Sequence, residues 1–125
     1  MIRRAVPLIL VASLAGLPVA AAESPVSQAF GNTIVSTYPD GRTGELWLQP
    51  NGAYTAKGRR GDPSNGHWSV KGDKLCLRQS RPIPTPFNFC TGMPRGGLDS
   101  AWTAKAVTGE QIRVKLVKGR YSGRG

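Results

Sequence analysis

The chain has 125 residues, of which 17 are Lys or Arg and 7 are Asp or Glu, so its formal net charge is +10 at pH 7. It contains one histidine and two cysteines. This length suits one domain with a modest core, and the sequence lacks the grouped His, Cys and carboxylate residues that metal centres and most acid–base catalysis need. We expect a basic protein that binds rather than catalyses and uses no cofactor.

Residues 1–22 are typical of a cleaved secretory signal peptide. Arg3 and Arg4 precede an apolar run, and small residues at Ala20 and Ala22 suit a signal peptidase. The alternative is an uncleaved membrane anchor, since the run is nearly long enough to span a bilayer. The arginine pair leaves the export route open. Cleavage leaves 103 residues with 15 basic and 7 acidic side chains, a net charge of +8. We expect a periplasmic or secreted protein.

Behind the signal, the pattern predicts three regions. These are an extended N-terminal segment at 23–32, a β-domain at 33–118 and a basic, flexible tail at 119–125. In the β-domain, short runs rich in β-branched and aromatic residues alternate with Gly- and Pro-containing turns. No window has a helical periodicity. The sequence therefore predicts an all-β domain of about eight strands.

The first two turns fix a register along the early strands. Three-residue loops at 39–41 and 50–52, each of the form Pro-x-Gly, suit hairpins with glycine in a left-handed conformation. They place Leu46 opposite Ile34 on one side and opposite Ala56 on the other. Apolar residues thus meet apolar residues, which supports this register because a slip by one residue would bury polar side chains.

Two later turns predict two more hairpins. A two-residue Gly-Asp turn places Trp68 opposite Leu77. A three-residue loop at 108–110 is expected to place Trp102 opposite Leu116 on the inward face. All four hairpins then direct one set of large side chains inward: Ile34, Leu46, Leu48, Tyr54, Trp68, Val70, Leu75, Leu77, Phe87, Phe89, Trp102, Val114 and Leu116.

This pattern predicts an eight-stranded antiparallel meander that closes into a small barrel, because closure removes the exposed strand edges. A two-sheet sandwich is the alternative. The interior of an eight-stranded barrel can be filled by side chains or can hold one small ligand. The Trp and Phe content favours a filled interior.

Two cysteines in an exported chain predict one disulfide, Cys76–Cys90. If their strands are neighbours, placing Cys76 opposite Cys90 also places Leu77 opposite Phe89, so the bridge and the core pattern agree. The bridge closes a loop of about 13 residues, for which the chain-entropy estimate is ~3 kcal/mol. We expect a structural role for it.

The predicted register directs the single histidine, His67, outward and opposite Arg78. That is a poor setting for a general base. A basic loop at 57–64 contains Arg59 and Arg60, and we consider two interpretations of it: a loop that docks an anionic partner, or a flexible connector whose charges favour solubility.

A second basic surface lies on the last predicted hairpin, where Lys105, Arg113 and Lys115 share the outward face. Like charges side by side repel, so such a cluster is either tolerated at small cost or meets an acidic partner. Further cations continue into the tail: Lys118, Arg120 and Arg124. Nucleic acid is an unlikely target, because no aromatic residues alternate with these cations.

The segment Trp68–Leu77 has the pattern W-x-[LV]-x-G-D-x-x-C-L. It resembles a family of periplasmic bacterial inhibitors of secreted zinc metalloproteinases. The resemblance implies an eight-stranded barrel with one disulfide and an inhibitory N-terminal segment that enters the protease cleft, here Glu23, Ser24 and Pro25. In that family the partner cysteine precedes this hairpin, whereas Cys90 follows it. The chain also resembles small exported β-proteins of Gram-negative bacteria with G-x-W and L-C-L elements.

From these observations we expect a non-catalytic, exported binding protein of the cell envelope. Its basic sheet face would recognise an anionic envelope component or an acidic protein surface, with an attraction that salt screens. The alternative is a periplasmic inhibitor of a secreted metalloproteinase.

Overall fold

A computed structural model describes residues 25–93 and 96–121, and the signal region lies outside them. The described chain contains one short 3₁₀ helix and eight strands, and none of its helices is long and apolar enough to cross a membrane. The elements are η2 (Pro25–Ala29), β1 (Thr33–Thr37), β2 (Thr43–Leu48), β3 (Ala53–Lys57), β4 (Pro63–Lys71), β5 (Lys74–Arg81), β6 (Phe89–Gly92), β7 (Ala101–Lys105) and β8 (Gln111–Val117).

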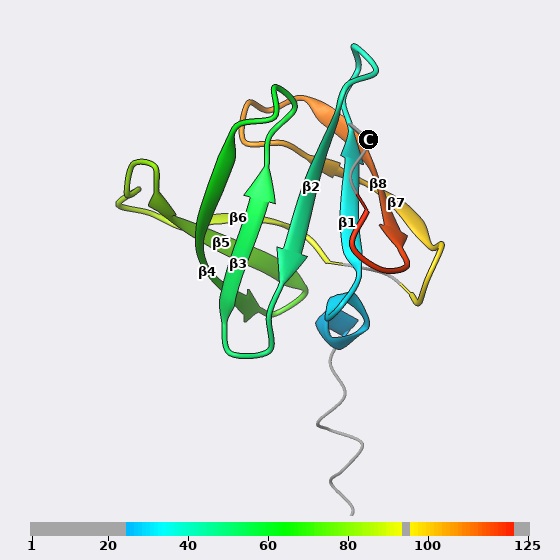
Figure 1. The fold of residues 1–125 in the computed structure, drawn as a ribbon, viewed down its shortest axis with the longest axis horizontal. Coiled ribbons are helices and arrows are strands. Elements are labelled where there is room, and N and C mark those ends of the chain that lie inside the picture. Colours follow the sequence, from blue (N-terminus) through cyan, green and yellow to red (C-terminus); the bar gives the residue numbers. More distant parts are fainter. Residues whose placement is uncertain (1–24, 94–95, 122–125) are drawn as a thin grey trace, which may run out of the picture.

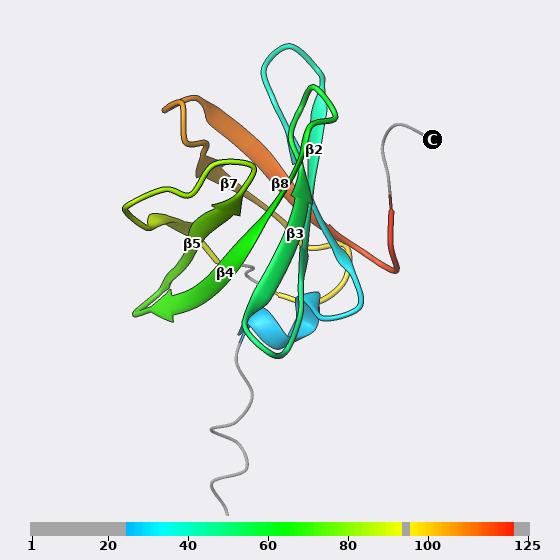
Figure 2. The same cartoon turned by 60° about the vertical axis from the view of Figure 1, so that its left-hand side comes forward.

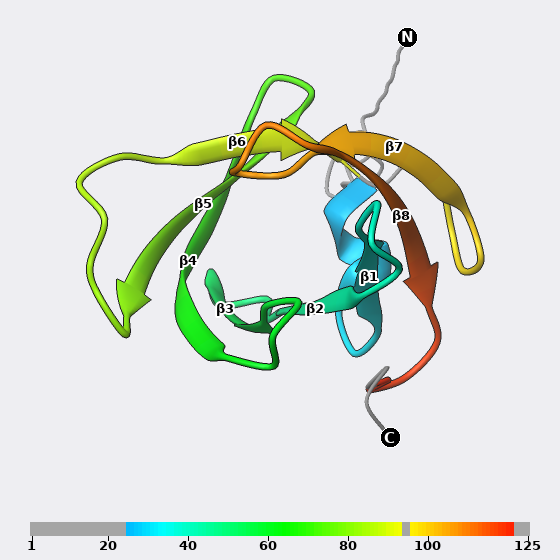
Figure 3. The ribbon, with the colours of Figure 1, turned by 90° about the horizontal axis from the view of Figure 1, so that it is seen from above.

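The eight strands form one antiparallel sheet in the order β6-β5-β4-β3-β2-β1-β8-β7 (Figure 1). The sheet curls until β6 and β7 lie side by side (Figure 3), although no backbone ladder joins them. A side chain bridges this seam, because Thr91 Oγ1 donates a hydrogen bond to the carbonyl oxygen of Lys105 at 3.2 Å. The predicted antiparallel meander and its closure into a nearly complete barrel are confirmed.

Three of the four predicted hairpins have the expected register. Leu46 pairs with Ile34 on β1 and with Ala56 on β3. Trp68 pairs with Leu77 across the two-residue turn between β4 and β5. The turn glycines at the ends of the two Pro-x-Gly loops have the positive φ angles that this loop type requires.

The predicted register of the fourth hairpin was wrong by two residues. In the structure Trp102 pairs with Val114, not Leu116, and Ala106 donates its backbone hydrogen bond to Glu110. The loop is therefore 107–109, and Gly109 (φ 91°) stands at its last position. Glycine belongs at that position because it adopts the left-handed conformation without a Cβ clash. The shift of two leaves every side chain on its predicted face.

The disulfide Cys76–Cys90 is present, and it joins two residues that lie directly opposite each other on β5 and β6. Leu77 pairs with Phe89, as the bridge requires. Most of the predicted inward set is buried or partly buried, but two members are not. Val70 is 40% exposed near the end of the β4–β5 hairpin, and Phe87 is 58% exposed in the β5–β6 connection.

The N-terminal segment was expected to be extended, but its part from Pro25 onward is not. Residues Pro25–Ala29 form η2, which lies under one end of the barrel (Figures 1 and 2). Val26 and Ala29 are buried in the main core. Phe30 packs against Trp68 with ring centroids 5.8 Å apart. This short helix therefore closes one end of the barrel with apolar side chains.

The first residues of the tail, expected to be flexible, are fixed to the outer wall. Thr33 donates a hydrogen bond from its hydroxyl to the carbonyl of Gly119 at 2.7 Å, and it accepts one from the backbone N–H of Tyr121 at 2.8 Å. The guanidinium of Arg120 stacks 4.0 Å from the centre of the Trp47 ring. Residues 122–125, with Arg124, lie outside the described part.

Candidate functional site

The structure places Lys105, Arg113 and Lys115 on the outer face of the β7–β8 hairpin, where all three are exposed. Arg113 pairs with Thr103, and Lys115 pairs with Ala101. Lys105 is thus diagonal to Arg113, two residues along the partner strand. Among the described residues, no carboxylate lies within ion-pair distance of these three cations. We call these three residues the basic face.

Two of the predicted tail cations lie in the described part of the chain. Lys118, the residue after β8, is exposed. Arg120 is also exposed, but its guanidinium already stacks on Trp47. The basic face itself holds only polar or small neighbours on its own hairpin, namely Ala101, Thr103 and Gln111. Its positive charge is not neutralised by acidic residues of the same hairpin.

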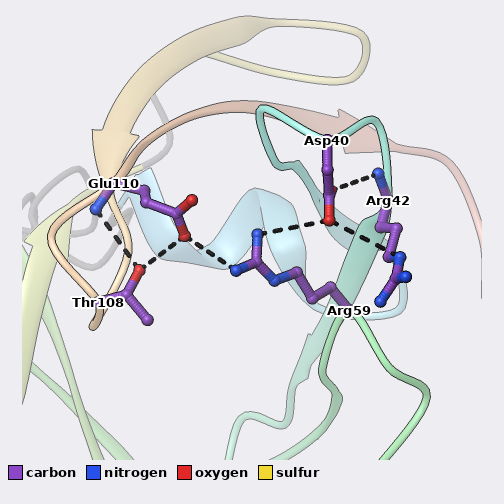
Figure 4. A network of polar contacts seen from close by, with 5 residues as sticks. All are labelled: Asp40, Arg42, Arg59, Thr108 and Glu110. Carbon is purple, nitrogen blue, oxygen red and sulfur yellow. Dashed lines mark hydrogen bonds and ion pairs between the residues drawn. The ribbon is translucent and has the colours of Figure 1, made fainter.

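The two candidate arginines of the 57–64 loop have different surroundings. Arg59 ties three hairpin loops together: its guanidinium lies 3.8 Å from Asp40 Oδ2 and 3.1 Å from Glu110 Oε1 (Figure 4). It also lies 4.4 Å from the centre of the Tyr38 ring. Arg59 is thus committed to internal contacts. Arg60 is exposed, and it makes no ion pair with another described residue.

Tyr38 lies next to this network, and the charges of Arg59 and Glu110 act on its hydroxyl. Burial raises the pKa of the Tyr38 hydroxyl, the positive charge of Arg59 opposes that shift, and the negative charge of Glu110 adds to it. Tyr38 therefore remains a neutral hydrogen-bonding group over the whole neutral pH range.

The barrel interior, expected to be filled, is partly hollow. A cavity of about 320 Å³ is lined by inward residues of the strands and by Tyr38, Gly58 and Val107 of the hairpin ends, and by no residue of η2. Trp68, which was expected to point inward, packs against Phe30 and does not line the cavity, whereas Tyr54, Phe89 and Trp102 do line it. Several inward positions around the cavity carry small residues: Ser36, Gly44, Ala56, Ser64 and Ala104.

Small residues at alternate positions were the sequence signal for this cavity. Gly44 and Ala56 stand on the inward face of β2 and β3, in phase with Leu46. Tyr54 lies deeper, where burial raises the pKa of its hydroxyl. The predicted registers already direct these small residues inward, so the cavity follows from the same pairings as the core.

Histidine and the candidate metal ligands were the residues of chemical interest left by the sequence. His67 is exposed on the outer face and pairs with Arg78, as the register predicted. No group of three or more His, Cys, Asp or Glu side chains in residues 25–93 and 96–121 could hold a metal ion.

The inhibitory segment suggested by the resemblance is only partly described. Glu23 and Ser24 lie outside the described residues, and Pro25 is the first residue of η2. Since Val26 is buried, any segment that protrudes into another protein must end before it.

Comparison of this chain with protein-family models, with curated proteins and with solved structures gives no match.

Proposed function

We propose that this protein is a non-catalytic binding protein of the cell envelope and that its basic face recognises an anionic envelope component or an acidic protein surface. One observation carries the proposal. Lys105, Arg113 and Lys115 share one exposed sheet face, without a described carboxylate within ion-pair distance. Neighbouring like charges on a sheet destabilise it, and an anionic partner would remove that cost.

A sheet face positions charges more firmly than a loop does. The three cations stand at defined register positions on two hydrogen-bonded strands, and β8 is also paired with β1. Their spacing is therefore fixed before binding, which lowers the entropic cost of recognising a matching array of anions. The disulfide supports localisation in a non-reducing compartment, which agrees with export as a periplasmic or secreted protein.

Binding to vesicles of anionic phospholipid and affinity capture from envelope extract test this proposal. We expect a variant with Lys105, Arg113 and Lys115 all changed to Glu to lose binding, and the wild type to lose it as salt rises above about 0.15 M. The matched control carries the same charge change elsewhere, at three exposed cations of the β4–β5 hairpin: Lys71, Lys74 and Arg78. Equal losses in both variants would mean that net charge, and not this face, attracts the partner.

A metalloproteinase inhibitor is the second candidate. The observation in its favour is the fold, an eight-stranded antiparallel barrel with one disulfide, which agrees with what the resemblance of Trp68–Leu77 implies. Inhibition would act through Glu23 and Ser24, immediately before η2. We expect deletion of these two residues to abolish inhibition of a secreted zinc protease while the charge-reversed basic face leaves it unchanged. The opposite pattern would rule this candidate out.

A further inference from the structure

The cavity in the barrel is a feature that recognition through the basic face does not use. Its lining includes residues beside three hairpin loops, namely Tyr38, Gly58 and Val107. The helix η2 lies under the other end of the barrel (Figures 1 and 2). The cavity reaches the surface, because two of its lining residues, Val107 and Phe87, are 69% and 58% exposed. Its volume of about 320 Å³ falls within the ~300–1,000 Å³ range of small-molecule sites.

Three charged residues, Glu45, Lys57 and Lys105, border the cavity. Each stands next to an inward-facing residue, Leu46, Ala56 or Ala104, so strand alternation directs its side chain to the outer face and leaves the inward side chains uncharged. Most inward side chains are aliphatic or aromatic. Water in such a space finds few hydrogen-bond partners, so an apolar molecule that displaces it gains free energy.

Small side chains and aromatic rings both line the cavity. Strands β1 to β4 contribute Ser36, Gly44, Ala56 and Ser64 together with the ring of Tyr54, and β6 and β7 on the opposite side (Figure 3) contribute the rings of Phe89 and Trp102. A side chain added at Gly44 would meet the carbonyl oxygen of Lys57 at 3.1 Å, so the cavity lies close to backbone there. Aromatic rings beside the space that small side chains leave suit a flat molecule that stacks on them.

Unused polar groups also line this space. The hydroxyls of Ser36 and Ser64 have no hydrogen-bond partner among the described residues. The indole N–H of Trp102 is buried and has no acceptor either, whereas Trp68 donates to Gln49. Two free hydroxyls in an otherwise apolar lining give a ligand fixed points for orientation.

We propose that the barrel cavity binds a small, flat, uncharged and mainly apolar molecule that carries a hydrogen-bonding group. The aromatic rings of Phe89 and Trp102 stack on it, and the hydroxyls of Ser36 and Ser64 receive its polar group. Arg59 holds the loops at the mouth through Asp40 and Glu110 and contributes no charge to the inside.

Titration with N-phenyl-1-naphthylamine tests the proposal, because this probe is uncharged, aromatic and fluorescent only in apolar surroundings. We expect one probe to bind per protein molecule. Energy transfer from the tryptophans to the bound probe provides a second signal, and Trp102, which lines the cavity, lies nearest to the site. The anionic analogue 8-anilinonaphthalene-1-sulfonate should bind the cavity less tightly at high salt, where attraction to the basic surface is screened.

Two alanines of β7 provide a matched pair of variants. Ala104 faces the cavity, whereas Ala101 is exposed on the outer face of the same strand. Ala104→Phe should weaken binding of N-phenyl-1-naphthylamine by about tenfold or more, because the added ring occupies the site. Ala101→Phe should leave the affinity unchanged. If Ala104→Phe does not fold, the pair Ala56→Leu and Ala53→Leu on β3 makes the same comparison, since Ala56 lines the cavity and Ala53 does not.

Absence of probe binding to the wild type would overturn the proposal. Equal binding by the Ala104→Phe and Ala101→Phe variants would overturn it as well, because the probe would then lie on an outer surface. This result can be distinguished from a failure of the proposed function, since Arg113 and Lys115 do not line the cavity and Lys105, which borders it, has its side chain on the outer face. Charge reversal at Arg113 and Lys115 alone should therefore leave probe binding unchanged.

Discussion

Among single residues, Thr33 has a role that the sequence did not predict: its hydroxyl makes three hydrogen bonds to distant parts of the chain. It accepts hydrogen bonds from Trp47 Nε1 and from the backbone N–H of Tyr121, both at 2.8 Å, and donates one to the carbonyl of Gly119 at 2.7 Å. A hydroxyl has one proton and two lone pairs, so its capacity is fully used. Thr33 is completely buried. One oxygen atom therefore joins β1, the Trp47 side chain and the tail, which Asn32 and the Arg120–Trp47 stack hold as well.

We predict that Thr33→Val lowers the free energy of unfolding by about 2–4 kcal/mol, because it keeps the shape of the side chain but leaves two N–H groups without an acceptor. Urea unfolding followed by Trp fluorescence measures the change. The matched control is Thr55→Val, whose hydroxyl is buried without any partner. That substitution should be neutral or stabilising. Equal losses in both variants would contradict the role of the Thr33 hydrogen bonds.

At the scale of elements, turn chemistry predicted most of the registers. Gly41 and Gly52 each end a three-residue loop, and these two loops correctly predicted that Leu46 pairs with Ile34 and with Ala56. The same rule applied to Gly109 would have given the observed loop at 107–109. The error arose because two registers that differ by two residues direct the same side chains inward, and the apolar pattern alone does not separate them.

The N-terminal helix and the tail were harder to predict. Residues Pro25–Ala29 have no capping or helical pattern long enough to stand out, and η2 forms because Val26 and Ala29 are buried against the end of the barrel. Likewise, Gly119 and Tyr121 are held by Thr33, 86 and 88 positions earlier in the chain. Contacts of this range depend on tertiary packing and leave no local signal in the sequence.

Strand β6 is the least supported element of the sheet. It has four residues and pairs only with β5, while the seam to β7 lacks a ladder. We predict that changing both Cys76 and Cys90 to Ala lowers the free energy of unfolding by about 3 kcal/mol. Urea unfolding of the wild type with and without a reducing agent should give a similar difference.

Hydrogen exchange tests where the loss occurs. In the bridgeless variant, the amides of β6 should exchange faster, while those of β1, which is paired on both sides, keep their protection relative to global unfolding. A uniform increase over all strands would instead indicate that the bridge stabilises the whole barrel and not the seam.

At the scale of the whole molecule, the sequence predicted the barrel but not its hollow end. Counting large residues treats Trp68 and Phe87 as filling, although the structure places Trp68 against Phe30 and leaves Phe87 58% exposed at the border of the cavity. Which aromatic residues share the interior depends on how the strands stagger along the barrel, and that stagger emerges only after all eight strands are paired.

The excess of positive charge is also a property of the whole molecule, and it leads to a prediction in which salt has opposite effects on stability and on binding. Ion pairs of the described residues involve only Arg42 and Arg59 with Asp40 and Glu110, so many cations remain uncompensated. Screening their mutual repulsion should raise the midpoint of urea unfolding between about 0.05 and 0.5 M salt. The same screening weakens attraction to an anionic partner.

The two triple charge reversals separate these effects. Reversal at Lys105, Arg113 and Lys115, or at the three cations of the β4–β5 hairpin, lowers the net charge equally. Both variants should therefore lose most of the salt dependence of stability, measured by the unfolding midpoint. Only reversal at Lys105, Arg113 and Lys115 should abolish binding of the anionic partner, because binding depends on where the charges lie. A wild type that becomes less stable in salt would contradict this view and would show that the ion pairs around Arg59 outweigh the repulsion among all the other cations.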